Sequence, residues 1–364
     1  MKHAPDIEPW LNLCLIDGLG DESIRRLLVA FGSPNKILSA NIHALERVVK
    51  TSFAKKIIHG GNPTKIATAF KWLEDPSNSI ITLADSDYPS QLLNITDPPP
   101  LLYFKGLRKL LNAPALAVVG SRNATPQGIA NAEAFAEAAS NAGLCIISGM
   151  ALGIDTAAHL GGLQGNAASI AIVGTGLDIV YPAKNHKLAH RLAKDGAIIS
   201  EFPLGTPAIG RNFPRRNRII SGMSQGCLVV EAALRSGSLI TARQALEQGR
   251  DVLAIPGSIH SPLSKGCHAL IKQGAKLVEN TQDILDELNY QSPSNSISLT
   301  AEINTHCSPE NPVLLKHLGH DIVDIDTLCA RSGLTAEAVS AMLLTLELDG
   351  LIASLPGGCY QRIQ

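Results

Sequence analysis

The chain is predicted to have an α/β fold, with an extended Rossmann-like, doubly wound and mainly parallel sheet as its main domain. Six short apolar runs recur through the middle of the chain, as expected of buried parallel strands. Helical patterns alternate with them, which indicates repeated strand–helix units. With 364 residues and a hydrophobic share of 45%, the chain can bury such a core and carry further domains.

Residues 1–78 are predicted to form a small helical domain. A Gly-x-Gly turn at 18–20 precedes an apolar-periodic helix over 23–30, which is the helix-hairpin-helix pattern. Backbone amides in such a turn can face a DNA phosphate. Asp17 and Asp21 flank the glycines and would repel phosphate, so a plain turn in a helical bundle is the favoured alternative.

Residues 79–288 are predicted to form the sheet domain. Its expected buried strands cover residues 116–119, 145–147, 170–173, 197–199, 227–230 and 252–255. Thr125 is expected to cap a helix that begins at Pro126. Asp155 and Ser238 are expected to cap the helices that follow them.

The C-terminal part begins with a predicted linker at 289–305, a polar stretch rich in Ser and Asn. Residues 306–364 then show two helical segments around a turn at Gly333 and a hairpin pattern, which predicts a winged-helix domain. Winged helices often place their second helix in a DNA groove. Here that helix carries acids and no Lys or Arg, so a protein-interaction domain is expected instead.

Composition limits the possible functions. A formal net charge of -1 means that any nucleic-acid site must be a focused basic patch. The 7 cysteines are scattered and form no Cys-x-x-Cys pair, which argues against disulfides and a metal site. No P-loop and no complete G-x-G-x-x-G occurs, so no cofactor is predicted. The chain shows no signal-peptide pattern and no apolar run of bilayer length, which predicts a cytoplasmic protein without a membrane partner.

Candidate binding residues follow the predicted strands, because ligands of open α/β sheets bind outside the carboxyl ends of the strands. Glycine lets phosphate approach the backbone, and Arg or Lys supplies charge. The candidates at these positions are Gly120, Ser121, Arg122, Gly149, Lys184, Asn185, Ser236, Gly237, Ser238 and Lys265.

A basic segment at 212–224, expected to be a loop, is the strongest single signal. It contains Phe213, Arg215, Arg216, Asn217 and Arg218, and no acidic residue occurs between 202 and 230. Guanidinium groups bind phosphate through paired hydrogen bonds, and an aromatic ring can stack on a base. The segment therefore predicts contact with a nucleic-acid backbone, with a solvated basic loop as the alternative.

Catalytic alternatives rest on other residues. Ser121, His159 and Asp155 are the types of a hydrolase triad, but no G-x-S-x-G accompanies them, and the spacing of Asp155 and His159 favours a structural hydrogen bond. Glu231 could act as the acid or base of a nucleotide-processing hydrolase, or pair with an arginine. A transcription factor that uses the winged helix is a further alternative, disfavoured by the acids of its second helix.

Six blocks resemble, in order, those of the DNA-processing protein A family, called DprA or Smf. They are VGSRNATPQG, SGMALGIDTAAH, GTGLDIVYPAKN, SEFPLGTPAIGRNFPRRNRIISGMS, VVEAALRSGSLITARQALEQGRDVLAIPG and SKGCHALIKQGA, within residues 115–276. The resemblance implies a non-enzymatic protein with no catalytic residues that binds single-stranded DNA. It also implies a homodimer formed through the Rossmann domain, and loading of the RecA recombinase during natural transformation.

The resemblance also implies roles for single residues. Arg122 matches an arginine that contacts backbone phosphate, and Lys184 matches the basic residue after the Tyr-Pro pair. Residues that match the pocket-lining block or further strand-end positions are Phe213, Arg216, Asn217, Arg218, Ser236, Gly237, Ser238 and Lys265. Leu152 stands where arginine is common, and Ser261 and His268 stand where asparagines are usual, so contacts at these three positions are not implied.

A homodimer would need an apolar surface on the sheet domain. The candidate surface covers residues 233–246 and 263–277. These segments contain more apolar residues than one buried helix face requires, although packing against the sheet can also bury all of them. The residues are Leu234, Leu239, Ile240, Leu270 and Ile271.

Overall fold

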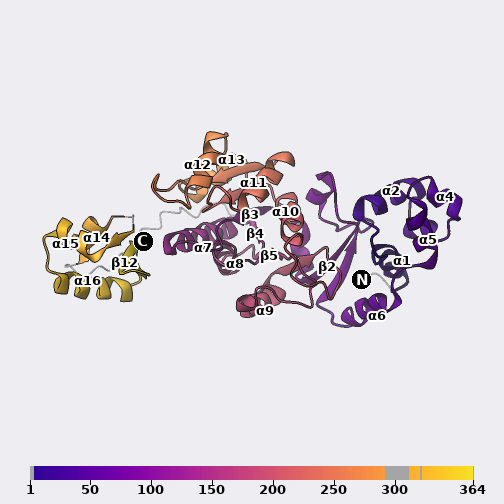
Figure 1. Cartoon of the computed structure of the whole chain (residues 1–364), viewed down its shortest axis with the longest axis horizontal. Helices are drawn as coiled ribbons and strands as arrows, with labels where there is room; N and C mark the ends of the chain where they lie inside the picture. Colours follow the sequence, from indigo (N-terminus) through magenta and orange to yellow (C-terminus); the bar gives the residue numbers. More distant parts are fainter. Residues whose placement is uncertain (1–3, 292–310, 320–321, 364) are drawn as a thin grey trace.

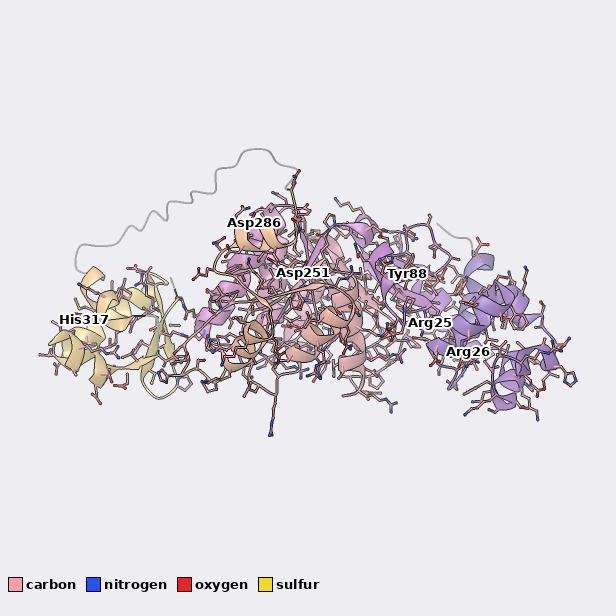
Figure 2. The ribbon with its side chains drawn as sticks, turned by 90° about the horizontal axis from the view of Figure 1, so that it is seen from above. Arg25, Arg26, Tyr88, Asp251, Asp286 and His317 are labelled. Carbon is pink, nitrogen blue, oxygen red and sulfur yellow. The ribbon has the colours of Figure 1, made fainter. Side chains whose placement is uncertain are left out.

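The computed structural model describes residues 4–291, 311–319 and 322–363. These residues form three parts in a row: a helical N-terminal part, a central sheet with helices on both faces, and a small C-terminal part (Figure 1). Figure 2 shows the same order from above. Within the described ranges no helix has the length and apolar character needed to cross a bilayer. Most of the predicted linker lies outside the described residues.

The N-terminal part is a helical bundle that packs on the edge of the sheet. Its helices are α1 (Ala4–Cys14), α2 (Asp21–Phe31), α3 (Pro34–Leu38), α4 (Ile42–Glu46), α5 (Thr51–His59) and α6 (Pro63–Trp72). Leu13, Leu27 and Leu45 belong to a core within the bundle. Trp10 of α1 instead packs in a cluster with Tyr103 of the sheet. The bundle therefore has its own core and a second apolar contact with the central part.

The central sheet is mixed, and six of its parallel strands match the six that the sequence predicted. Its strands are β1 (Asn78–Thr82), β2 (Leu101–Gly106), β3 (Ala115–Val119), β4 (Cys145–Ser148), β5 (Ser169–Ile172), β6 (Ala197–Ser200), β7 (Gly226–Val229), β8 (Asp251–Ala254) and β9 (Lys276–Leu277). Their order is β1-β2-β6-β5-β4-β3-β7-β8-β9. Strands β3 to β9 pair in parallel, whereas β1 and β2 extend the β6 edge as an antiparallel pair. β1 and β2 were not predicted, because they stand outside the alternation of apolar runs and helices, and β9 was not predicted because its two exposed residues form no apolar run.

Helices cover both faces of the sheet and change face in the middle of the strand order. The helices are α7 (Pro126–Asn141), α8 (Ile154–Gln164), α9 (His186–Asp195), α10 (Asn212–Gly222), α11 (Ser238–Glu247), α12 (Lys265–Lys272) and α13 (Thr281–Glu287), with 3-10 turns η1 (Ser90–Asn94), η2 (Arg108–Asn112) and η3 (Ala183–Asn185). One core joins the sheet to α7, α8 and α13, and another joins it to α10, α11 and α12. The winding therefore reverses between β3 and β7, which is the switch point where doubly wound sheets bind ligands.

The C-terminal part has the predicted winged-helix fold. Its elements are α14 (Asn311–Leu318), β10 (Val323–Asp324), α15 (Ile325–Ser332), α16 (Ala336–Leu348), β11 (Ile352–Leu355) and β12 (Cys359–Arg362). Gly333 ends α15 in the left-handed conformation, with φ of 71°. Gln361 of β12 approaches Gln127 of α7, with Nε2 and Oε1 separated by 3.3 Å. The wing sheet thus lies against the first helix of the central part.

Of the three predicted helix caps, one is confirmed. The Thr125 hydroxyl accepts a hydrogen bond from the Gly128 N–H at 3.0 Å. Asp155 lies inside α8, because the chain turns at Gly153 and the helix begins at Ile154. Ser238 is likewise the first residue of α11, without a capping bond from its side chain. The last two predictions were wrong because each helix begins earlier than its polar residue suggested.

Candidate nucleic-acid interface

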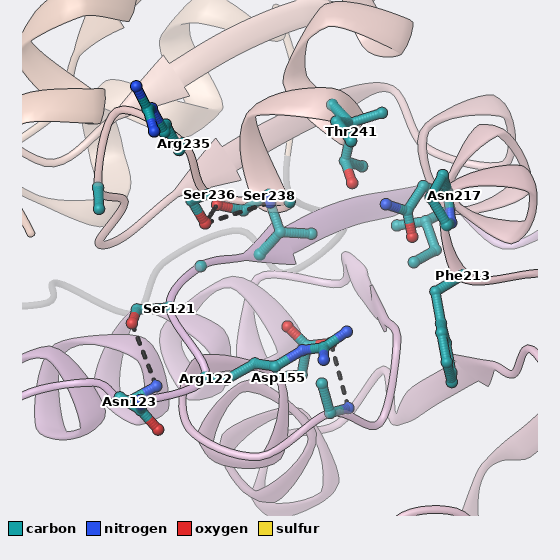
Figure 3. Close-up of a pocket in the computed structure, with 18 of the residues that line it drawn as sticks. Ser121, Arg122, Asn123, Asp155, Phe213, Asn217, Arg235, Ser236, Ser238 and Thr241 are labelled. Carbon is teal, nitrogen blue, oxygen red and sulfur yellow. Dashed lines mark hydrogen bonds between the residues drawn. The ribbon is translucent and has the colours of Figure 1, made fainter. Parts of the chain in front are cut away.

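A cavity of about 700 Å³ opens at the carboxyl ends of β3 and β7, at the switch point of the sheet. The loops after β3, β4 and β7 line it together with α10 (Figure 3). The predicted site residues that it brings together are Gly120, Ser121, Arg122, Phe213, Arg216, Asn217, Ser236, Gly237 and Ser238. Side chains from segments far apart in sequence therefore face one space.

Arg122 and Phe213 form the aromatic side of the cavity. The exposed Arg122 guanidinium lies over the Phe213 ring, with Cζ 5.6 Å from the ring centroid. The Tyr181 ring lies 5.6 Å from Phe213 on a tilted plane. Arg122 extends toward Phe213 across the cavity in Figure 3. A cation beside exposed ring faces suits both a phosphate and a base.

The loop after β7 forms the other side. Exposed Arg235 lines the cavity, as do Ser236 and Ser238, whose hydroxyl oxygens lie 2.7 Å apart. Space around Gly237 is open on the side where a Cβ would stand. Arg235 was not among the predicted binding residues, because the resemblance matched only the Ser-Gly-Ser that follows it.

Arg216 lies beneath the cavity rather than at its rim. Its buried guanidinium donates to the carbonyl oxygens of Gly149, at 2.6 Å, and of Ile172. A Cβ on Gly149 would collide with this guanidinium, so the close approach requires glycine there. Burial lowers the pKa of Arg216 to about 10, and the Asp155 carboxylate opposes that change. The guanidinium is thus a positive charge fixed in position in the floor of the cavity.

The arginines of the basic segment do not share one surface. The segment forms α10 instead of the expected loop, because Pro214 falls in the first helical turn, where a missing N–H is tolerated. Successive residues of a helix point in directions about 100° apart. Phe213 and Asn217 therefore face the cavity, whereas Arg215 and Arg218 face the N-terminal part.

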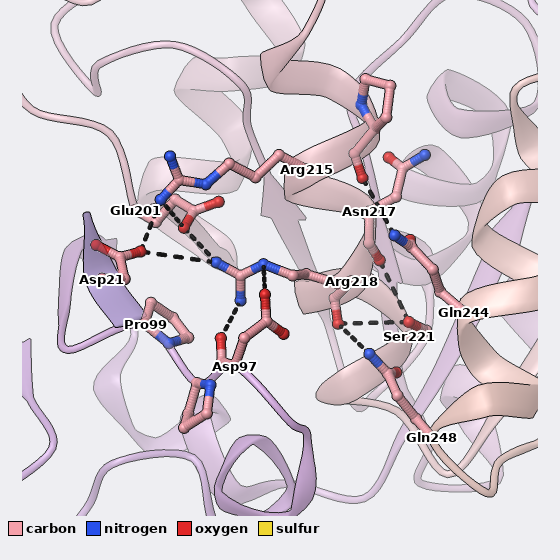
Figure 4. A network of polar contacts seen from close by, with 12 residues as sticks. Asp21, Asp97, Pro99, Glu201, Arg215, Asn217, Arg218, Ser221, Gln244 and Gln248 are labelled. Atoms are coloured by element: carbon pink, nitrogen blue, oxygen red, sulfur yellow. Dashed lines mark hydrogen bonds and ion pairs between the residues drawn. The ribbon is translucent and has the colours of Figure 1, made fainter. Parts of the chain in front are cut away.

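Carboxylates hold Arg215 and Arg218 (Figure 4). Both guanidinium groups bond the Glu201 carboxylate, whose side chain is only 1% exposed. Arg215 also pairs with Asp21 of α2 at 2.6 Å, and Arg218 pairs with Asp97 at 3.0 Å. Burial raises the pKa of Glu201, and Arg218 and Arg215 oppose the rise. This network could not be predicted from the sequence, because Asp21 and Asp97 are distant along the chain and Glu201 stands just before the acid-free stretch.

Three further predicted residues lie outside the cavity lining. Lys184 is exposed on η3. Asn185 is buried, and its Nδ2 donates to the Met150 carbonyl and the Thr156 hydroxyl, each at 2.9 Å. The Lys265 ammonium donates to a backbone carbonyl of its own loop. Asn185 is thus a structural link, while Lys184 stays free to meet a ligand.

Glu231 faces a second cavity of about 730 Å³, between the loops after β7 and β8 and the wing. Its carboxylate accepts from the Thr125 N–H at 3.0 Å and from the Thr125 hydroxyl at 2.5 Å. Burial raises the pKa of Glu231, and these two bonds oppose the rise. Of the two alternatives left open for Glu231, the pairing with an arginine is not seen among the described residues, because its carboxylate bonds Thr125 at the start of α7 instead.

His159 is a buried structural residue, but it does not form the hydrogen bond with Asp155 that the spacing of the two residues favoured. Its Nε2 accepts from the Met150 N–H at 3.2 Å, and its Nδ1 lies 2.7 Å from the Ser169 hydroxyl. Burial lowers the pKa of His159 to about 3, which keeps the ring neutral. Asp155 does not bond this ring but accepts from the Gly149 and Ala151 N–H groups, each at 3.2 Å. Both side chains fix the loop after β4.

Comparisons of the sequence with known families and proteins give consistent matches. The family model described as DNA recombination-mediator protein A matches residues 79–289, and a DprA winged helix domain matches residues 300–358. Protein Smf of Escherichia coli is 40% identical over 371 residues, which covers 99% of this chain and 96% of that protein. DNA processing protein DprA of Streptococcus pneumoniae is 48% identical over 215 residues, or 59% of this chain and 75% of that protein.

Solved structures agree with these matches. The X-ray structure of DNA processing protein A from Streptococcus pneumoniae has a TM-score of 0.70 at 37% identity, and the match covers 79% of this chain and 99% of that one. DNA processing protein A from Helicobacter pylori, whose structure is described for a unique single-stranded DNA binding mode, has a TM-score of 0.53 at 30% identity. That match covers 58% of this chain and 96% of the other.

Proposed function

Because the chain belongs to the DNA recombination-mediator protein A family, as its six blocks indicated, we propose that it binds single-stranded DNA in the switch-point cavity. One observation carries the proposal: Arg122 and Arg235, from the loops after β3 and β7, both line this cavity. No carboxylate of the described residues lies within ion-pair distance of either guanidinium. Two unpaired cations facing one space favour an anionic ligand.

Different residues of the cavity would contact the phosphates and the bases of the strand. Arg122 and Arg235 bind phosphates from opposite loops, and Lys184 binds a phosphate at the rim. Phe213 stacks on a base, a contact worth about 1–3 kcal/mol in single-strand binders. Further contacts come from Gly120, Ser121, Asn217, Ser236, Gly237 and Ser238. Such contacts read charge and ring faces rather than base edges, so binding tolerates changes of sequence.

Other members of the predicted site would act indirectly. Arg216 supplies a fixed charge from below, and Gly149 makes room for it. Asn185 and Lys265 hold loops in place. Arg215 and Arg218 are held by carboxylates and so connect the N-terminal part to the sheet instead of contacting DNA.

Membership of the family supports a proposal for the cellular role. We propose a cytoplasmic, non-enzymatic mediator that protects incoming single strands and loads the RecA recombinase on them during natural transformation. The position of Glu231 supports a role without catalysis, because its carboxylate caps α7 in a different cavity. The recombinase step is tested by the rate at which RecA filaments nucleate on single strands coated with single-strand-binding protein. Acceleration by this protein is expected, and an unchanged rate would contradict loading.

A homodimer through the sheet domain is part of the proposal. Leu234 is 64% exposed and Leu246 is 51% exposed, and both belong to the candidate surface around α11. Leu270 is instead buried in the core, and Leu239 and Ile271 are packed against it, so they contribute less than the sequence suggested. Two subunits would present two cavities to one strand and bind it with avidity. Light scattering at micromolar concentration should give twice the chain mass, and Leu234→Asp with Leu246→Asp should halve it.

The binding proposal is tested with a single-stranded oligonucleotide and its duplex at two salt concentrations. Fluorescence anisotropy should show tighter binding of the single strand at both concentrations, with affinity falling as salt rises. Equal or tighter binding of the duplex would contradict the proposal.

A further inference from the structure

Helix α9 exposes a row of basic side chains, of which only Lys184 has a role at the rim of the cavity. The row begins on η3 and is here called the α9 strip: Lys184, His186, Lys187, His190, Arg191 and Lys194, all exposed. Leu188 and Leu192, on the opposite side of the helix, are buried against the sheet. α9 is therefore strongly amphipathic, and its polar side is cationic.

The Lys and Arg residues of the α9 strip have no ion-pair partner in the described part of the chain. Arg215 and Arg218, from the segment that looked most basic in sequence, are by contrast neutralised. α9 carries one acid, Asp195, at its last residue. Asp155, the one acid of neighbouring α8, is buried and bonded to backbone amides. The strip therefore keeps its positive potential.

The α9 strip continues from the wall of the cavity. Tyr181, which is 45% exposed, precedes it and lies 5.6 Å from the Phe213 ring. The bond from Asn185 to the Met150 carbonyl fixes the start of α9 to the loop after β4, whose Ala151 lines the cavity. A chain of contacts thus leads from the Arg122–Phe213 pair over Tyr181 to the first cations of the strip.

We propose that the α9 strip is a second contact surface for single-stranded nucleic acid, an inference that rests on the proposed function of the cavity. A cavity of about 700 Å³ has the size of a small-molecule site, so a longer strand must leave it. The strand passes over the exposed Tyr181 ring and lays its phosphates along Lys187, Arg191 and Lys194. These contacts carry no sequence information and add to the salt dependence of binding.

The test compares deoxyoligonucleotides of about 6 and about 30 nucleotides, binding to the full chain at several salt concentrations. The variant is Lys187→Ala/Arg191→Ala/Lys194→Ala. Its matched control, Lys36→Ala/Arg47→Ala/Lys50→Ala, removes three exposed cations from the N-terminal helices. We expect the variant to lose affinity for the long strand about tenfold or more, with a salt slope lower by about 0.7 for each lost contact. The short strand and the control should bind as the unchanged protein does.

Each other outcome has a definite meaning, provided thermal melting shows that both variants fold. Unchanged affinity and slope for the long strand would overturn the second surface, while the cavity stands if Arg122→Ala/Arg235→Ala still weakens both strands. An equal loss for the short strand would also overturn it, because the substitutions would then act on the cavity. If the unchanged protein binds neither strand, the proposed function itself fails.

Discussion

At the scale of single residues, burial and pairing distinguish arginines that look alike in sequence. Arg122 and Arg235 are exposed and unpaired within the described chain, Arg216 is a buried charge beneath the cavity, and Arg215 and Arg218 are bound to carboxylates. Sequence could place these residues near strand ends, because strand ends are marked by apolar runs and glycines. It could not assign their partners, because partners are set by which side of α10 each residue occupies.

Removal of Arg218 should destabilise the fold. The Arg218→Ala variant leaves the buried Glu201 carboxylate with fewer partners, and breaking a buried ion pair costs about 3–5 kcal/mol. Because burial raises the pKa of Glu201, the folded state binds a proton at this carboxyl group more tightly than the unfolded state does. The stabilisation that comes from this proton is present at low pH and is lost as the pH rises through the folded-state pKa. The deficit in the free energy of unfolding should therefore be larger at about pH 8 than at about pH 5.

Urea unfolding monitored by circular dichroism measures this deficit. Arg122→Ala is the control, since an exposed and unpaired side chain should change stability by no more than about 0.5 kcal/mol. A deficit for Arg218→Ala that is equal at both pH values would show that Glu201 does not control it.

Replacement of Glu231 separates a structural role from a catalytic one. Glu231→Gln keeps the shape of the side chain but weakens the charge-assisted bonds to Thr125, so the loss of stability should be about 1 kcal/mol. Single-strand affinity should stay within about twofold of that of the unchanged protein, a difference of about 0.4 kcal/mol. Release of free base from nucleoside monophosphates by the unchanged protein, abolished in this variant, would instead support a hydrolase.

At the scale of elements, the sequence predicts what periodicity encodes and misses what depends on context. Six strands and the two helices of the wing could be predicted, because the apolar runs and turn residues that mark them lie within each segment. α10 was expected to be a loop, because its charged residues hid the apolar positions Ile219 and Ile220 that face the core. β1 pairs with β2, and β2 joins the sheet through β6, a contact between distant segments that local patterns do not encode.

Asn185 links two such elements, η3 and the loop after β4. Its substitution by alanine removes the donor to the Met150 carbonyl and the Thr156 hydroxyl, which should cost about 1–3 kcal/mol. The melting temperature should fall, and affinity for single strands should fall with an unchanged salt slope, because no phosphate contact is lost. A lower slope with an unchanged melting temperature would make Asn185 a direct DNA contact.

At the scale of the whole molecule, the parts lie in a row and contribute differently. The N-terminal part is joined to the sheet by the Glu201 network and by the Trp10 cluster. The wing lies beside the second cavity, and none of its described residues lines the cavity proposed to bind DNA. Its helix α16 carries no Lys or Arg, so the wing provides little phosphate binding.

Truncation after residue 291 tests this division. Single-strand affinity of the truncated protein should stay within about threefold, because the cavity and the α9 strip both remain. Fluorescence anisotropy with an oligonucleotide of about 30 nucleotides measures this affinity. Light scattering checks that the number of chains per particle is unchanged. Loss of most of the affinity in a folded truncation would place DNA contacts on the wing.

The proposed DNA binding depends on unpaired cations of two loops, which contact the phosphates of one strand at the switch point. Its most direct test is the salt dependence of single-strand affinity for Arg122→Ala/Arg235→Ala, beside the control Lys36→Ala/Arg47→Ala. Two lost phosphate contacts should lower the slope of log affinity against log salt by about 1.4, with an unchanged melting temperature and no change in the control. A folded double variant that keeps the full slope and affinity would contradict this dependence.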